Sequence, residues 1–113
     1  MEDMKTILLF ILCFSNNFVF SQTREIIFSS AAPKPIGPYS QAVKAGGTIY
    51  VAGQLAIKSD GTLDTTSIEN EMKQVMSNLE AILKEAKSDF CKVNKVTIYT
   101  TDLKQFSRFN EVR

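Results

Sequence analysis

The sequence contains no histidine and no tryptophan, and only two cysteines, three prolines and five glycines are spread over 113 residues. Without histidine, a Ser-His-Asp triad, histidine acid–base catalysis and histidine metal ligation are excluded. Two cysteines are too few for a thiolate zinc site. The glycines form no phosphate-binding loop, because Ala45-Gly-Gly47 lacks both the spacing and the lysine-serine ending of one.

The charges are nearly balanced, with 13 lysines and arginines against 12 aspartates and glutamates. Basic residues alternate with acidic ones and do not cluster with aromatics, so we expect no nucleic-acid partner. The carboxylates are scattered and show no pair suited to glycoside chemistry. The apolar content of 44% and the charged content of 22% are typical of one soluble globular domain.

The N-terminal segment 1–21 has the order of a secretory signal: a lysine, a short apolar run, and small residues at a cleavage point. Cleavage is expected after Ser21, which leaves a domain over 22–113 that is periplasmic or secreted and not bound to a membrane. Cys91 is then the one remaining cysteine, so no intramolecular disulfide is possible. An uncleaved anchor or an ordinary buried helix is the alternative, and without a signal the protein would be cytoplasmic.

Three short β-strands are predicted at the start of the domain. Strand-forming residues between small polar ones indicate strands at 24–30, 39–44 and 48–52. Gly46 and Gly47 accept positive φ and predict a tight hairpin between the second and third strands. Because short turns join all three segments, we expect an antiparallel meander.

A long amphipathic helix follows, because apolar residues then recur at helical spacing on one face. These residues are Ile68, Met72, Val75, Met76, Leu79, Ile82, Leu83 and Ala86. Thr66 and Glu69 have the spacing of a capping box and predict the start of the helix. Asn78 is expected on the solvated side, and Glu80 and Lys84 predict an ion pair four residues apart.

The β-branched run 93–101 predicts a fourth strand, which the intervening helix would place parallel to an earlier strand. Asp102, with Gln105 three residues later, predicts the N-terminus of a second helix. Composition and spacing therefore indicate a small α+β domain and do not by themselves name its chemistry.

Several segments stand in order along the domain: Ile36-Gly-Pro-Tyr-Ser-Gln-Ala-Val43, Ile49-Tyr-Val-Ala-Gly-Gln54, the long helix, Asp89-Phe90, and Asp102-Leu-Lys-Gln-Phe-Ser-Arg-Phe-Asn-Glu111. Together they closely resemble the RidA family of reactive intermediate deaminases, also called the YjgF or L-PSP endoribonuclease family, from about Ile27 to Val112. The resemblance implies an α+β, chorismate-mutase-like fold with the order β-β-β-α-β-α.

The resemblance also implies a homotrimer with clefts between subunits. Family members hydrolyse small 2-imino acids to 2-keto acids and ammonia without a cofactor, which suits a histidine-free site. Carried over by position, Tyr39 matches the cleft tyrosine and would donate a hydrogen bond that orients the substrate. Gly53 matches a backbone contact to the substrate, Phe106 a ring lining the cleft, and Asn110 an asparagine near the subunit boundary.

The sequence departs from the family pattern in three places. Ala52 stands where many members carry serine, and Lys87 stands where the long helix often ends in glycine. The family's Pro-Ala-Arg strand and its final glutamate-containing strand have no counterpart, and neither Arg108 nor Arg113 can be transferred to that arginine's role. The chain is therefore expected to be a truncated deaminase with impaired activity.

Two other functions stay open. A non-catalytic small-ligand or protein-binding member is favoured by Ala52 and by the missing arginine. A ribonuclease or translation inhibitor is the weaker alternative, because the sequence has neither histidine nor a basic surface.

Overall fold

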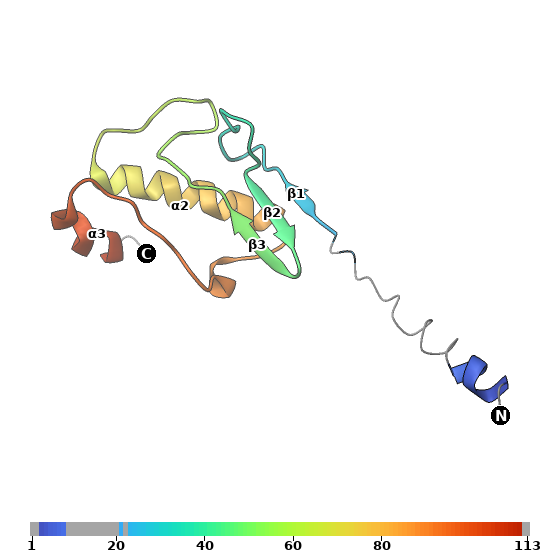
Figure 1. Ribbon diagram of the computed structural model, residues 1–113. Helices are drawn as coiled ribbons and strands as arrows, with labels where there is room; N and C mark the ends of the chain where they lie inside the picture. Colours follow the sequence, from blue (N-terminus) through green and yellow to red (C-terminus); the bar gives the residue numbers. More distant parts are fainter. Residues whose placement is uncertain (1–2, 9–20, 22, 112–113) are drawn as a thin grey trace.

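The computed structural model describes residues 3–8, 21 and 23–111. Its folded part is an α+β unit in which a three-stranded sheet lies against one long helix (Figure 1). The predicted signal segment 1–21 lies mostly outside the described residues; its residues 3–8 are helical. Among the described residues, no helix is long and apolar enough to cross a bilayer.

The sheet consists of β1 (Glu25–Ile27), β2 (Ala42–Ala45) and β3 (Thr48–Val51), paired antiparallel in that order. This confirms the predicted meander. Gly46 and Gly47 have φ values of 55° and 80° and form the two-residue turn between β2 and β3, as predicted. β2 begins later than predicted, at Ala42.

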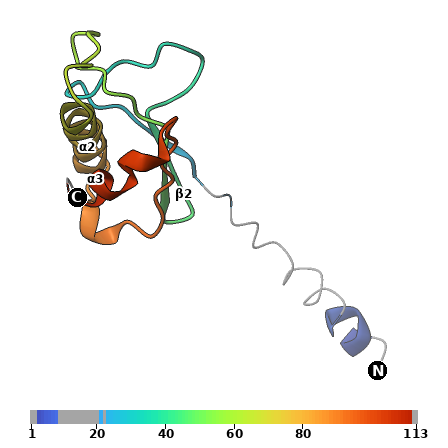
Figure 2. The ribbon, with the colours of Figure 1, turned by 90° about the vertical axis from the view of Figure 1, so that its left-hand side faces the viewer.

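Helix α2 (Ile68–Glu85) covers one face of the sheet, and Figure 2 views it nearly along its axis with β2 beside it. Ile82 has no exposed surface and packs with Ala86 against Ile27 and Ala42 of the sheet. Removing such a side chain from water contributes about 1.5–3 kcal/mol to folding. This contact is the centre of the core and fixes the helix on the sheet.

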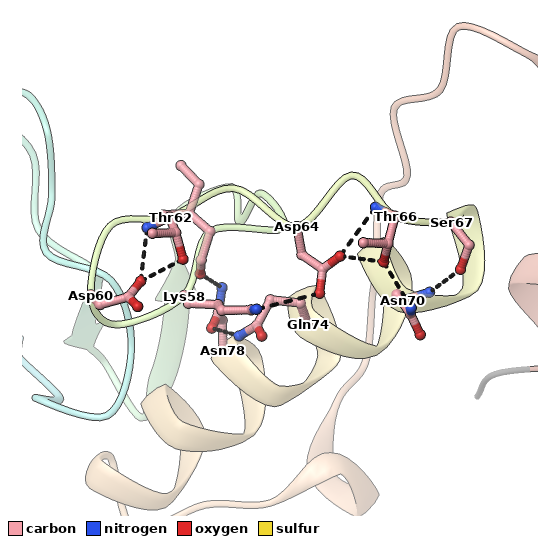
Figure 3. A network of polar contacts seen from close by, with 10 residues as sticks. Lys58, Asp60, Thr62, Asp64, Thr66, Ser67, Asn70, Gln74 and Asn78 are labelled. Atoms are coloured by element: carbon pink, nitrogen blue, oxygen red, sulfur yellow. Dashed lines mark hydrogen bonds and ion pairs between the residues drawn. The ribbon is translucent and has the colours of Figure 1, made fainter.

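The start of α2 differs from the prediction by one residue. Ser67, not Thr66, is the N-cap, and its hydroxyl accepts a hydrogen bond from the Asn70 amide at 3.2 Å. The Thr66 hydroxyl instead donates to Asp64 Oδ1 at 2.7 Å and accepts from Asn70 Nδ2 at 2.8 Å (Figure 3). The spacing predicted Thr66 as the N-cap, but its hydroxyl is hydrogen-bonded to Asp64 instead. The Glu80–Lys84 ion pair forms as predicted, at 2.8 Å.

The end of α2 is a complete Schellman motif. The Ser88 amide donates to the Leu83 carbonyl at 2.8 Å, and the Lys87 amide donates to the Lys84 carbonyl at 2.9 Å. Lys87 has φ 57°, a left-handed conformation that glycine adopts without steric cost. The backbone of Lys87 is therefore strained, as predicted from a lysine at this position.

Asn78 is buried, which corrects the prediction that it lies on the solvated side of the helix. It is 1% exposed, and its Nδ2 donates to the carbonyls of Leu55 at 3.0 Å and Ile57 at 2.8 Å. Gln74 donates to Asn78 Oδ1 at 2.9 Å (Figure 3). The asparagine therefore holds the loop after β3 on the helix, a contact between residues more than 20 positions apart.

Gln41 makes a similar connection between the residue before β2 and the segment that follows β1. Its Oε1 accepts from the Ser29 amide at 2.6 Å, and its Nε2 donates to the carbonyls of Ser29 at 3.0 Å and Pro33 at 2.9 Å. The side chain is 2% exposed. It satisfies backbone groups of a segment that the prolines keep out of the sheet.

The predicted fourth strand at 93–101 is wrong for this structure. In the described part of the chain, residues 93–100 belong to no strand and pair with none of β1, β2 and β3. Ile98 is 51% exposed and Tyr99 93%. A β-branched sequence becomes a strand only when a neighbouring strand accepts its backbone hydrogen bonds, and here none does.

The last described elements follow this extended segment. After the short 3₁₀ turn η1 (Phe90–Lys92), the chain runs to η2 (Leu103–Gln105) and α3 (Phe106–Glu111). Asp102 caps the start as predicted, accepting from the Lys104 amide at 2.9 Å. Arg108 pairs with Glu69 at 3.3 Å, which ties α3 to the first turn of α2.

Candidate functional site

The turn before β2 presents Tyr39 on the surface. The Tyr39 amide donates to the Gly37 carbonyl at 2.8 Å, and the phenol oxygen accepts from the Ile36 amide at 3.4 Å. A Cβ at Gly37 would lie 3.4 Å from two ring carbons of Tyr39, which shows that the ring lies against the turn. The side chain is 52% exposed. The segment therefore holds a phenol in a defined place while leaving it accessible.

An open depression of about 620 Å³ lies at this turn and continues over the sheet. Residues from three parts of the chain line it: Arg24, Gly37, Pro38, Tyr39, Ser40, Val43, Tyr50, Val51 and Ala52. The depression is shallow and open to solvent in the single chain. Its lining combines apolar residues, two phenols, one hydroxyl and one guanidinium.

The strand register explains which side of the sheet carries the depression. Ile27, Ala42 and Val51 stand in one row across the sheet and face α2. Side chains alternate along a strand, so the neighbouring row of Ile26, Val43 and Tyr50 faces the opposite way. Val43 and Tyr50, which line the depression, therefore lie on the face opposite α2, whereas Val51, which also lines it, packs toward α2.

Gly53 follows directly after the lining residue Ala52 and is exposed. An added Cβ would meet nothing within 4 Å, so packing within this chain does not require glycine there. The Ala52 amide donates to the Gln41 carbonyl at 2.9 Å, and Gln54 Nε2 donates to the Ala52 carbonyl at 3.1 Å. These bonds fix the backbone beside Gly53.

Phe106 and Asn110 lie elsewhere on the described surface. Both belong to α3, which stands beside the first turn of α2 in Figure 1, and neither lines the depression. Phe106 is 56% exposed, and Asn110 is exposed. Within one chain the structure thus places Tyr39 at the depression and Gly53 next to it, but does not bring Phe106 and Asn110 there.

Two carboxyl groups with shifted pKa values lie in the loop before α2, away from the depression. Hydrogen bonds from the Thr66 hydroxyl and amide lower the pKa of Asp64, and the Lys58 ammonium at 3.7 Å acts in the same direction. The Thr62 hydroxyl and amide likewise lower the pKa of Asp60. These groups hold a loop together and are not poised for proton transfer.

No cluster of three or more potential metal ligands exists among the described residues. Cys91 is exposed in η1. Neither observation adds a catalytic group to the depression, whose polar atoms belong to Arg24, Tyr39, Ser40, Tyr50 and the backbone.

Arg24 and Tyr50 are lining residues that the sequence reasoning did not select. The alternation of side chains along a strand could have predicted them. Arg24, just before β1, and Ile26 lie on one face, and the strand register places Tyr50 on the same face of the sheet. The register depends on pairing across the hairpin, so these residues come together only in the fold.

Fold and site together define a small α+β protein of the chorismate-mutase-like class with a shallow, open depression beside Tyr39. The family model described as Endoribonuclease L-PSP matches residues 29–113. The chain belongs to this family, the same RidA family that its sequence segments resemble.

Two relatives illustrate the membership. A RutC family protein of Pyrococcus abyssi is 48% identical over 90 residues, which are 79% of this chain and 71% of that protein. The 2-iminobutanoate/2-iminopropanoate deaminase of Bos taurus is 43% identical over 93 residues, 81% of this chain and 68% of that protein.

Solved structures agree on the fold. The Rid family protein YyfA of Yersinia pestis is 36% identical with a TM-score of 0.77, covering 80% of this chain and 72% of its own. E. coli TdcF with bound serine is 30% identical with a TM-score of 0.73, covering 78% and 69%. These neighbours confirm the chorismate-mutase-like α+β fold.

Proposed function

We propose that this protein hydrolyses 2-imino acids to 2-keto acids and ammonia in the depression beside Tyr39. The observation that carries the proposal is the accessible phenol at an open, mostly apolar depression in a chain 43% identical to a 2-iminobutanoate/2-iminopropanoate deaminase. The bound serine of E. coli TdcF supports a ligand of this size and polarity.

The chemistry makes modest demands on the protein. Water adds to the electrophilic imine carbon, both of its protons end on the nitrogen, and the carbon–nitrogen bond of the adduct breaks to leave the 2-keto acid and ammonia. Positioning and charge stabilisation can accelerate such a step without a strong base. Tyr39 would orient the imino acid by a hydrogen bond, and the backbone beside Gly53 would allow close approach.

The proposed site is built between copies of the chain. A homotrimer would cover the open sheet face, where Ile26 is 62% and Tyr50 63% exposed, and could bring Phe106 or Asn110 of one copy toward Tyr39 of another. Sedimentation equilibrium of the uncleaved 113-residue chain should then report three times its mass of 12.6 kDa. A monomer at every concentration would contradict the trimer.

The proposal includes export. The order of charge, apolar run and small residues in 1–21 supports a signal peptide removed after Ser21. Mass spectrometry of the protein from the producing cell should find an N-terminus at residue 22, whereas retention of Met1 or Met4 would contradict cleavage and favour a cytoplasmic protein.

The assay generates 2-iminobutanoate enzymatically and follows 2-oxobutanoate and ammonia. We expect 2-oxobutanoate and ammonia to form faster than in buffer. Tyr39→Phe should lower the rate roughly tenfold by removing one hydrogen bond. Tyr99→Phe, on the exposed 93–100 segment, is the matched control and should leave the rate unchanged.

A rate equal to that in buffer would overturn the enzymatic proposal and favour the second candidate, a non-catalytic protein that binds a small ligand in the same depression. Ala52, where many members carry serine, supports that candidate. RNA cleavage is weaker, despite the family description, because the sequence has no histidine and a net charge of only +1.

A further inference from the structure

Gln41 commits its whole side-chain amide to one stretch of backbone. Its Oε1 accepts from the Ser29 amide at 2.6 Å, and its Nε2 donates to the carbonyls of Ser29 at 3.0 Å and Pro33 at 2.9 Å. A side-chain amide nitrogen has two donor hydrogens, so both are used. Because Gln41 is only 2% exposed, its side chain acts inside the chain and not on a ligand.

The side chain of Gln41 stands in for a strand that begins late. Ile27 of β1 pairs with Ala42, the first residue of β2. Continuing this register would place Ser29 opposite Ser40, but Ser40 lies outside β2. The side chain of Gln41 bonds to both backbone groups of Ser29 instead. The main chain before Ala42 can therefore leave the sheet while the backbone groups of the buried Ser29 stay satisfied.

The third bond of Gln41 anchors the turn 33–39, which carries Tyr39. All three prolines of the sequence lie in this turn, and each lacks a backbone donor. The turn's other hydrogen bonds stay inside it and join the Tyr39 amide to Gly37 and the Tyr39 phenol to Ile36. Among the described residues, the side chain of Gln41 is thus the hydrogen-bonded link between this turn and the rest of the fold.

The backbone of Gln41 reaches the other predicted substrate contact. Its carbonyl accepts from the Ala52 amide at 2.9 Å, and Ala52 lines the depression directly before Gly53. Tyr39 precedes Gln41 by two residues. One buried residue therefore connects the turn that carries Tyr39 to the backbone beside Gly53.

We propose that Gln41 is a positioning residue, which holds the Tyr39 phenol in place relative to the backbone at Gly53. A hydrogen-bond donor accelerates a reaction only in the right geometry, and a small displacement removes much of its effect. Gln41 touches no substrate and acts through Tyr39. This inference rests on the proposed imine hydrolysis for its effect on rate, whereas the hold on the ring rests on hydrogen bonds within the chain.

Fluorine NMR of the 113-residue chain tests the position of the ring without requiring turnover. The sequence contains three tyrosines, so labelling with 3-fluorotyrosine gives three signals, which tyrosine-to-phenylalanine variants assign. Gln41→Met keeps the length of the side chain and removes its hydrogen bonds. We expect it to move the Tyr39 signal toward that of an unstructured peptide and to leave the Tyr99 signal in place.

Asn78→Leu is the matched control, because Asn78 is also buried and donates two hydrogen bonds to backbone carbonyls, but in the loop after β3. It should lower the midpoint of thermal unfolding, as Gln41→Met does, and leave the Tyr39 signal unchanged. If Gln41→Met does not fold, Gln41→Asn takes its place, since it keeps the amide and shortens its reach by one methylene. An unmoved Tyr39 signal in the folded variant, or an equal movement in Asn78→Leu, would overturn the positioning role.

A double-mutant cycle measures whether Gln41 acts through Tyr39. Gln41→Met should lower the rate of ammonia release by up to about tenfold, the effect expected of Tyr39→Phe. In the Tyr39→Phe chain the same change should lower the rate by less than about twofold, because the effects of coupled residues do not add. Equal factors in both backgrounds would show a general structural loss and contradict the positioning role.

The two proposals fail separately. A Tyr39 signal that depends on Gln41 in a chain without ammonia release would retain the hold of Gln41 on Tyr39 and contradict the deaminase activity. Ammonia release with a rate and a Tyr39 signal that Gln41→Met leaves unchanged would retain the activity and contradict the positioning role.

Discussion

Residues 25–92 and residues 93–111 contain similar kinds of side chain, yet only the first region contains buried residues. Ile82 has no exposed surface, whereas Ile98 is 51% exposed. The first region has paired strands, a helix that covers them, and Gln41 and Asn78 joining loops to both. The segment 93–100 is also rich in β-branched residues but has no strand to pair with in the described structure. Pairing and burial, rather than propensity, decide which segment becomes ordered sheet.

The two regions should differ most in how much stability is lost when an isoleucine is truncated. Ile82→Ala should lower the free energy of unfolding by about 3 kcal/mol, because it leaves a cavity between α2 and the sheet. Ile98→Ala makes the same chemical change at an exposed site and should cost less than about 0.5 kcal/mol. Urea unfolding followed by circular dichroism measures both. Equal losses would show that Ile98 is buried in solution and would break the comparison.

The asparagines offer a second matched pair. Asn78→Ala leaves the carbonyls of Leu55 and Ile57 without their buried donor and should cost about 2 kcal/mol. Asn94→Ala changes an exposed residue and should stay within about 0.5 kcal/mol of the native chain. If Asn78→Ala proved as mild as Asn94→Ala, the loop after β3 would not be held by the helix.

The end of α2 should respond in the opposite direction. Lys87→Gly relieves a left-handed residue at φ 57° and should stabilise the protein by about 1 kcal/mol. Lys84→Gly, within the same helix, should destabilise it by about 1 kcal/mol. Thermal unfolding of both variants measures the contrast, and a loss of stability in Lys87→Gly would mean that the Schellman motif is not strained.

The smallest effect is a pH dependence confined to the loop before α2. Folding lowers the pKa of Asp64 through hydrogen bonds from Thr66, so its stabilisation is complete above the ordinary value of 3.8 and is lost as pH falls through the lowered value. The stability difference between the native chain and Asp64→Asn should therefore be full at neutral pH and shrink as the pH falls below 3.8. A stability difference that does not change with pH would show that Asp64→Asn acts through packing and not through the charge of Asp64.

The elements that the sequence predicted correctly are those with local causes. Paired glycines made the hairpin between β2 and β3, and the helical spacing of apolar residues made α2. The wrong predictions concern residues whose partners lie far along the chain. Asn78 bonds to residues 21 and 23 positions away, and no pattern within the helix reveals that. The predicted capping box is wrong for a local reason. The Thr66 hydroxyl donates to the nearby Asp64 and does not cap the helix.

The candidate site shows the same division. Tyr39 was selected from a segment that resembles a family, and the structure places it at an accessible depression. Arg24 and Tyr50 were missed, because they meet on one face only through the register of three strands. Whether Phe106 and Asn110 join the site depends on contacts between copies of the chain and stays a prediction.

Amide hydrogen exchange of the intact chain tests most directly whether the two regions differ as described. We predict strong protection in β2, β3 and α2, and exchange near the rate of an unstructured peptide at residues 94–99, whose amides have no strand partner in the described structure. Protection at 94–99 equal to that of β2 would contradict this account, because it would show that the segment is a paired strand in solution.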